Sequence, residues 1–148
     1  MRGRAGKLQT GFAVTLAFGM LTSGCIEETV CRSVYVLAID ASRVTSIDIV
    51  DRSEPSRSSL PTTITEAAVI RDVLQTIQDP NPKWTVPIAG PPIGKISILM
   101  NYGADFVGRV TVGSTFLEGK GCGGFFIRDI TTEERDALLG RLGMQWQG

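Results

Sequence analysis

The chain has 148 residues, with 15 basic and 15 acidic side chains and no histidine, so its formal net charge at pH 7 is zero. The absence of histidine excludes the Ser-His-Asp and Cys-His pairs of nucleophilic enzymes and the usual zinc sites. No basic cluster follows residue 24, so a nucleic-acid partner is not expected, because phosphate binding needs grouped Lys and Arg side chains.

The first predicted element is an N-terminal segment with the layout of a secretory signal peptide. Arg2, Arg4 and Lys7 make a basic start, and residues 12–21 form an apolar run that leads to Leu-Thr-Ser-Gly-Cys at residues 21–25. The run has about half of the ~20 apolar residues that a membrane-spanning helix needs. We therefore expect a cleaved leader and no permanent span.

The cysteine at the expected cut site makes this segment resemble a bacterial lipoprotein precursor with its lipobox. The resemblance covers residues 1–25 and implies cleavage after Gly24, diacylglycerol on Cys25 and, in many species, acylation of the new amino group. Thr22 stands where this family prefers Leu. The alternative is a secreted protein that is cut elsewhere and keeps Cys25 as a plain thiol.

The resemblance also implies a location in the cell envelope. Asp after the lipidated cysteine retains enterobacteria-like lipoproteins in the inner membrane, but this chain has Ile26 there, which favours the outer membrane, facing the periplasm. Removing residues 1–24 takes away three basic and no acidic residues, leaving 12 against 15 and a net charge of −3. Residues 25–32 are expected to be a short tether, so the domain of residues 33–148 should lie close to the membrane.

The cysteine count predicts a disulfide. If Cys25 carries lipid, Cys31 and Cys122 remain as an even pair in an oxidising compartment. Their bond would close a loop of about 90 residues, for which chain entropy gives at most ~4–5 kcal/mol of stabilisation. The alternatives are two inert thiols, or a reactive Cys122 in a glycine-rich loop beside a lysine.

The first half of the domain predicts a hairpin followed by a helix. β-Branched and aliphatic residues indicate strands at residues 34–40 and 44–50, joined by a turn. Residues 51–59 are polar and indicate an exposed loop. Thr63 and Glu66 have capping-box spacing and predict a helix start at Thr63. Apolar residues at helical spacing follow until the prolines at residues 80 and 82.

The second half predicts four short strands and a final helix. Residues 80–94 form a loop stiffened by five prolines around Trp84. Strands are expected at residues 95–102, 106–112, 115–117 and 125–127, and Gly108 is suited to a bulge or to close packing. Thr131 and Glu134 repeat the capping-box spacing, with Gly140 and Gly143 as candidate helix ends.

These elements predict an α+β fold with the order β-β-α-β-β-β-α. Consecutive strands with short connections favour a single antiparallel sheet of about five strands, and the two helices should pack on one of its faces.

Few side chains in this pattern point to chemistry. Glycine-rich residues 119–124 fail as a phosphate-binding Walker A loop, because Gly121 stands where Ser or Thr is needed, and a hairpin turn explains them better. Adjacent acids such as Glu133 and Glu134 cannot face each other across a substrate. Asp48, Arg109 and Arg128 are expected on solvated strand faces or in surface pairs.

Trp84 is the best candidate for a partner-binding residue, because long loops are often functional and Trp is common at binding hot spots. The alternative is that Trp84 folds back as a lid over a helix or a sheet face. Trp146 is expected to dock the last helix.

The sequence therefore predicts a lipid-anchored envelope protein that is not an enzyme, needs no metal or cofactor, and binds an envelope protein or supports envelope maintenance. The alternatives are an inhibitor of an envelope or secreted enzyme, acting by loop insertion, and an enzyme that works without histidine.

Overall fold

The computed structural model describes residues 34–53, 60–90 and 92–147. The expected signal peptide at residues 1–24, the tether at residues 25–32 with Cys25 and Cys31, and most of the polar loop at residues 51–59 lie outside the described residues.

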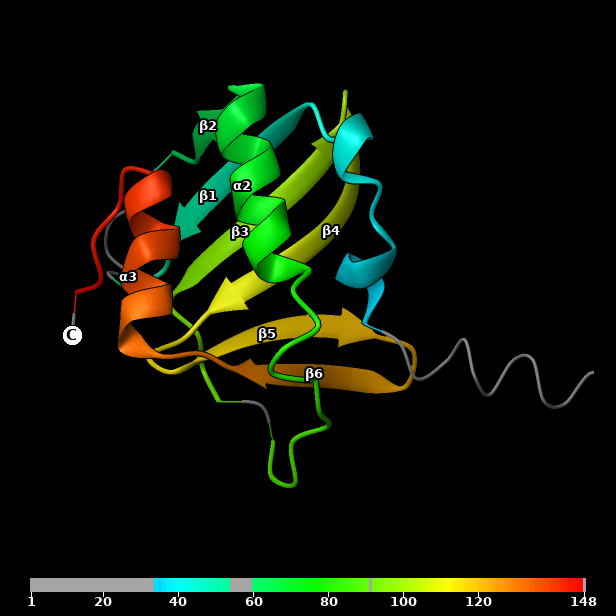
Figure 1. Cartoon of the computed structure of the whole chain (residues 1–148), viewed down its shortest axis with the longest axis vertical. Coiled ribbons are helices and arrows are strands. Elements are labelled where there is room, and N and C mark those ends of the chain that lie inside the picture. Colours follow the sequence, from blue (N-terminus) through cyan, green and yellow to red (C-terminus); the bar gives the residue numbers. More distant parts are fainter. Residues whose placement is uncertain (1–33, 54–59, 91, 148) are drawn as a thin grey trace, which may run out of the picture.

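The core of the fold is one antiparallel sheet in the strand order β2-β1-β3-β4-β5-β6, with helices α2 and α3 on one face (Figure 1). The predicted α+β class with two helices on one face is confirmed, with six strands in place of about five. The strands are β1 (Ser46–Asp51), β2 (Thr62–Ile64), β3 (Ile96–Tyr102), β4 (Asp105–Val112), β5 (Phe116–Gly121) and β6 (Gly124–Asp129), and the helices are α2 (Ala67–Ile77) and α3 (Thr132–Arg141).

Alternate residues of the central strands supply the floor of the hydrophobic core. Ile47 and Ile49 of β1 pair with Met100 and Ile98 of β3, and all four side chains are buried. The apolar face of α2 covers them, because its buried residues recur every three or four positions. The buried residues of the two helices are Ile70, Val73, Leu74, Ile77, Leu138 and Leu139, together with Arg135.

The predicted hairpin of residues 34–40 and 44–50 is wrong. The second predicted strand is present as β1, but of residues 34–40 only Val34 pairs, through an isolated bridge to Gly121. The chain then forms the 3-10 helices η1 (Tyr35–Ala38) and η2 (Ala41–Arg43). β4 pairs with β5 only as far as Gly119, so the far end of β5 is left open to Val34. The partners of β1 are instead β2 and β3, which leave no position for a third strand.

The predicted helix start at Thr63 is also wrong, because this residue belongs to the edge strand β2. Thr63 pairs with Asp48 and donates a hydrogen bond of 2.6 Å from its hydroxyl to the Asp48 carboxylate. β-Branched residues at positions 62–65 suit a strand. Helix α2 begins at Ala67 with Glu66 at its N-cap, and no side-chain capping bond forms there.

The ends of both helices otherwise follow the local sequence. α2 ends at Ile77 before the prolines, and the Gln78 side-chain amide donates to the carbonyls of Val36 and Ile39 at 2.9 and 2.8 Å, which ties η1 to the helix. α3 begins with the predicted capping box of Thr131 and Glu134.

Glycine shapes two of the hairpins as expected. In the β5–β6 hairpin, Gly121 pairs with Gly124 and Gly123 has a φ of 89°, so the glycine-rich segment is a hairpin turn. In β4, Gly108 lies opposite Met100 beside a register shift, where a side chain would collide with Ile39.

Gly119 of β5 permits close packing of two distant segments and provides a stability test. An added Cβ would lie 2.6 Å from Cγ1 of Val34 and 3.1 Å from Cζ3 of Trp84, both of which are buried. We expect Gly119→Ala to lower the free energy of unfolding by ~1–3 kcal/mol, because the site is already full.

The matched control is Gly140→Ala in α3, where an added Cβ meets no atom within 4 Å. This change should raise the free energy of unfolding by ~0.5–1 kcal/mol, since Gly weakens a helix interior. Urea denaturation measures both variants. Equal stability of Gly119→Ala and the parent would contradict the packing described here.

Candidate functional site

Trp84 is not the exposed contact residue that the sequence suggested. Its side chain is 7% exposed and packs in the core against Gly119, so the alternative of a lid over the sheet is the one observed. The reason is that Gly119 lacks a side chain and leaves room for an indole over the inner face of β5. Trp84 therefore fixes the base of the loop.

The exposed residues of that loop follow Trp84. Val86, Ile88 and Ile93 are 67%, 109% and 94% exposed, and we call residues 85–90 and 92–94 the apolar loop. No charged residue lies between Trp84 and Lys95 in the sequence. The loop projects beyond β6 at the edge of the sheet (Figure 1). Large exposed aliphatic side chains gathered in one segment are typical of a surface that contacts another protein or a membrane.

Both ends of the apolar loop are held by backbone hydrogen bonds. Thr85 forms an isolated bridge with Ile127 of β6, with two N–H to O bonds of 2.8 Å. At the other end the Lys95 amide donates to the Val112 carbonyl at 3.0 Å. The loop therefore leaves and re-enters the sheet at fixed points, so its apolar side chains project from a defined place.

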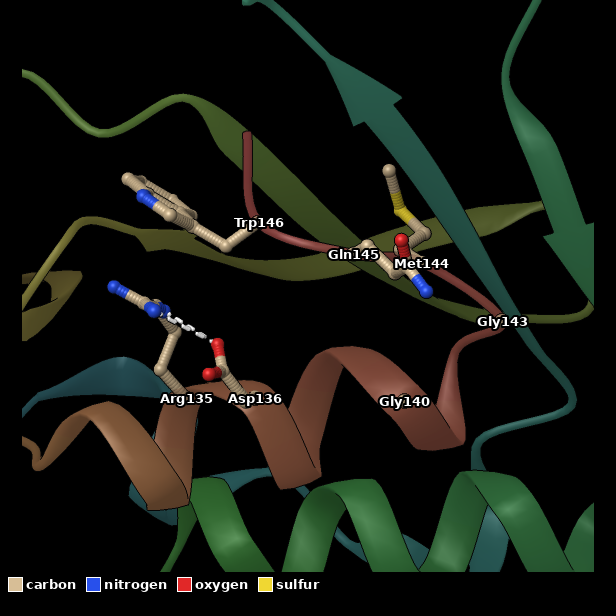
Figure 2. Close-up of a pocket in the computed structure, with 7 residues that line it drawn as sticks. All are labelled: Arg135, Asp136, Gly140, Gly143, Met144, Gln145 and Trp146. Atoms are coloured by element: carbon tan, nitrogen blue, oxygen red, sulfur yellow. Dashed lines mark hydrogen bonds and ion pairs between the residues drawn. The ribbon is translucent and has the colours of Figure 1, made fainter. Parts of the chain in front are cut away.

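A second candidate surface is a groove between α3 and the C-terminal segment, which we call the C-terminal groove. It has a volume of about 640 Å³ and lies between the helix and residues 143–146 (Figure 2). Its lining residues are Arg135, Asp136, Gly140, Gly143, Met144, Gln145 and Trp146.

The C-terminal segment turns back along α3 because of a glycine cap. Gly143 has a φ of 70°, its amide bonds to the Gly140 carbonyl, and the Met144 amide bonds to the Leu139 carbonyl. This pair of bonds is a Schellman motif. The expectation that Gly143 ends the helix is thus confirmed, whereas Gly140 lies inside α3.

Trp146 holds the returning segment over the helix, as predicted. Its ring contacts two cations, with its centroid 4.8 Å from the Arg135 guanidinium and 5.3 Å from the Lys95 ammonium. The Lys95 ammonium also donates to the Gln147 carbonyl at 3.1 Å.

Arg135 is in turn fixed from two sides, by the Ser114 carbonyl at 2.8 Å and by the Asp136 carboxylate at 2.8 Å. Figure 2 shows the indole above the guanidinium, with the Met144 side chain pointing away from α3.

The groove is consequently a preformed feature with mixed chemistry. The aromatic ring of Trp146 offers apolar surface, Asp136 offers an exposed carboxylate, and Gly140 leaves open space where other residues would place a side chain. Its volume falls within the ~300–1,000 Å³ of ligand sites. Sequence reasoning noticed Trp146 and the two glycines singly, but the fold-back that unites them depends on the tertiary structure.

Arg128 contradicts the expectation of a solvated strand face. It is 1% exposed, because the pairing of β5 with β6 places it opposite Leu117 on the inner face. Its guanidinium donates to the Asp79 carbonyl at 3.0 Å, and burial lowers its pKa, opposed by the charges of Glu134 and Asp79. Arg128 also contributes to a cleft of about 480 Å³ between α2 and α3. Its hydrogen bond shows that it anchors the chain after α2.

The outer face of the sheet carries the other two predicted polar residues. Asp48 accepts hydrogen bonds from Thr63 at 2.6 Å and from the Asn101 amide at 2.9 Å, so it joins three strands. Arg109 lies near Glu118 of β5, which is half-buried. Desolvation raises the pKa of Glu118, and the charges of Arg109 and Arg52 lower it by less.

Of the three predicted cysteine roles, only that of Cys122 falls on described residues. Cys122 is disulfide-bonded, which removes the alternative of a reactive thiol at this position. Cys25 and Cys31 lie outside the described residues, so lipidation and the Cys31–Cys122 pairing stay predictions.

Within the described ranges, no group of three or more His, Cys, Asp or Glu residues could hold a metal ion. No helix in the described part of the chain is long and apolar enough to span a membrane.

Comparison with known proteins identifies no relative, since no protein-family model, no curated protein and no solved structure matches this chain.

The raised pKa of Glu118 predicts a pH dependence of stability. A group whose pKa is higher in the folded state stabilises the fold below its ordinary pKa of 4.5, and this stabilisation is lost as the pH rises through the raised value. Replacing Glu118 with Gln removes the free-energy cost of ionising a half-buried carboxyl group. We therefore expect the melting temperature of Glu118→Gln, relative to the parent, to be higher at about pH 7 than at about pH 4. A relative melting temperature that falls as the pH rises would contradict desolvation as the dominant cause.

Proposed function

We propose that this chain is a lipid-anchored protein of the cell envelope whose domain binds a segment of a partner protein in the C-terminal groove. The groove carries the proposal. Trp and Arg, which are enriched in the cores of protein interfaces, line it together at Trp146 and Arg135.

The arrangement of the groove favours a protein partner. Trp146 is held by two cations and Arg135 by two hydrogen-bonding partners, so little side-chain freedom is left to lose on binding. Helix α3 and the C-terminus, which form the groove, lie on the opposite side of the domain from η1, the cyan segment near the start of the described chain (Figure 1). A domain tethered through its N-terminus would therefore present the groove away from the membrane.

The anchor rests on the N-terminal sequence, and the disulfide supports the same compartment. Val34, three residues after Cys31, bridges Gly121, the residue before Cys122. This pairing brings the two chain segments together at the point where a Cys31–Cys122 bond would form. Such a bond persists in an oxidising compartment.

Filling the groove tests partner binding. Gly140→Arg places a long side chain in the groove without altering the residues that hold the C-terminal segment. With a photo-crosslinking residue at Gln145, we expect the parent to crosslink a specific envelope protein and Gly140→Arg to lose about tenfold or more of that product, equivalent to ~1.4 kcal/mol of binding. Gly140→Ala is the matched control and should retain the crosslink. Equal crosslinking by Gly140→Arg and the parent would refute the groove as the binding site.

Intact mass spectrometry of the mature protein tests the anchor and the disulfide. We expect the chain to begin at Cys25 with a diacylglyceryl group, and Cys31 and Cys122 to be alkylated only after reduction. The variant Cys25→Ser should stay unlipidated and fail to fractionate with membranes. An unmodified Cys25 in the mature parent would overturn the location, and alkylation of Cys31 without reduction would overturn the pairing.

A further inference from the structure

We infer that the apolar loop contacts the lipid bilayer, with the side chains of Val86, Ile88 and Ile93 lying at the boundary between headgroups and acyl chains. This inference rests on the lipid anchor of the proposed function. It assigns a second, independent membrane contact to the folded domain.

The first argument is the chemistry of the loop. Ile88 and Ile93 are almost fully exposed, and Val86 is two-thirds exposed. The segment between Trp84 and Lys95 contains no charge, so entering a lipid surface would desolvate no ionised group. Aliphatic side chains in water gain free energy when an apolar phase covers them.

The second argument is the length and position of the chain outside the described residues. About nine residues separate Cys25 from Val34, and an extended chain of that length spans at most ~30 Å. Val34 bridges Gly121 at the end of β5, and Thr85 bridges Ile127 on the adjoining strand β6. Val34 and Trp84 also pack against the same residue, Gly119 of β5, so the tether joins the domain close to the base of the apolar loop. The tether therefore keeps this β5–β6 edge of the sheet near the bilayer.

Other exposed side chains at this edge agree with that orientation. Phe125 of β6 lies opposite Lys120 of β5, and both are exposed. Lys83 is exposed immediately before Trp84 at the base of the loop. Lysines beside apolar residues suit a membrane interface, because their ammonium groups reach the phosphates while the apolar side chains enter the lipid.

The third argument is that the loop is already positioned. Trp84 is buried against Gly119, and the bridge of Thr85 to Ile127 fixes the start of the loop. Proline at positions 87 and 92 limits the backbone further. A stiff apolar projection loses little conformational entropy when it meets a surface.

The experiment uses the lipidated mature protein in vesicles of phosphatidylethanolamine and phosphatidylglycerol. Ile88→Trp adds an indole at the loop, and Leu60→Trp adds one at an equally exposed aliphatic site beside β2, at the far edge of the sheet. The parent, with Trp84 and Trp146, gives the baseline. Acyl chains carrying bromine should quench the added fluorescence of Ile88→Trp on the order of twofold and leave that of Leu60→Trp unchanged.

Vesicle co-sedimentation separates this inference from the proposed function. If the parent does not sediment with vesicles, the lipid anchor fails and the inference fails with it. If the protein sediments and Ile88→Trp is quenched no more than Leu60→Trp, the loop contact alone is overturned. A blue shift of Ile88→Trp with envelope proteins, and none with vesicles, would assign the loop to a protein partner and equally overturn the inference.

Discussion

The close contact at Gly119 is the constraint on which the arrangement of this domain depends. Because this position of β5 has no side chain, Val34 and Trp84 both pack against its backbone from segments far apart in the sequence. Val34 ends the N-terminal connection, and Trp84 begins the apolar loop. One glycine thus brings the first described residue and the base of the loop together, and the orientation that we propose at the membrane rests on that contact.

On the other side of the domain, a series of contacts between cations, a carbonyl, a carboxylate and an aromatic ring holds the C-terminal segment. Arg135 bonds to Ser114 and Asp136, the Trp146 ring lies over Arg135, and the Lys95 ammonium also contacts this ring. Each contact limits the freedom of the next, so the C-terminal segment forms the wall of a groove. The domain then has two separate surfaces, an apolar one beside the tether and a mixed one on α3. This separation suits a protein held at a membrane that binds a partner on its other side.

The burial of Trp84 and Arg128 could not be predicted from the sequence alone. The sequence favours Trp84 as the binding residue of the proline-rich loop, because Trp is common at binding hot spots. Its burial could not be predicted locally, because it depends on Gly119, 35 positions later in the chain. Arg128 was misplaced for a related reason. Three consecutive apolar residues, 125–127, do not reveal which alternate set faces inward, and only the pairing with β5 decides it.

The sequence by itself determined the features that depend on neighbouring residues. These are the capping box of α3, the apolar face and the end of α2, the hairpin turn at Gly123, and the net charge. The leader and the lipidated cysteine stay predictions that rest on the sequence alone. The tertiary structure decided which segments pair as strands and which side chains are buried, because both depend on the space that neighbouring elements leave. Thr62–Ile64 pair with the edge of β1 opposite β3, so residues 34–40 have no edge of β1 to join and form a bridge to Gly121 and the 3-10 helix η1. Local propensity is worth a fraction of a kcal/mol per residue, so such pairings override it.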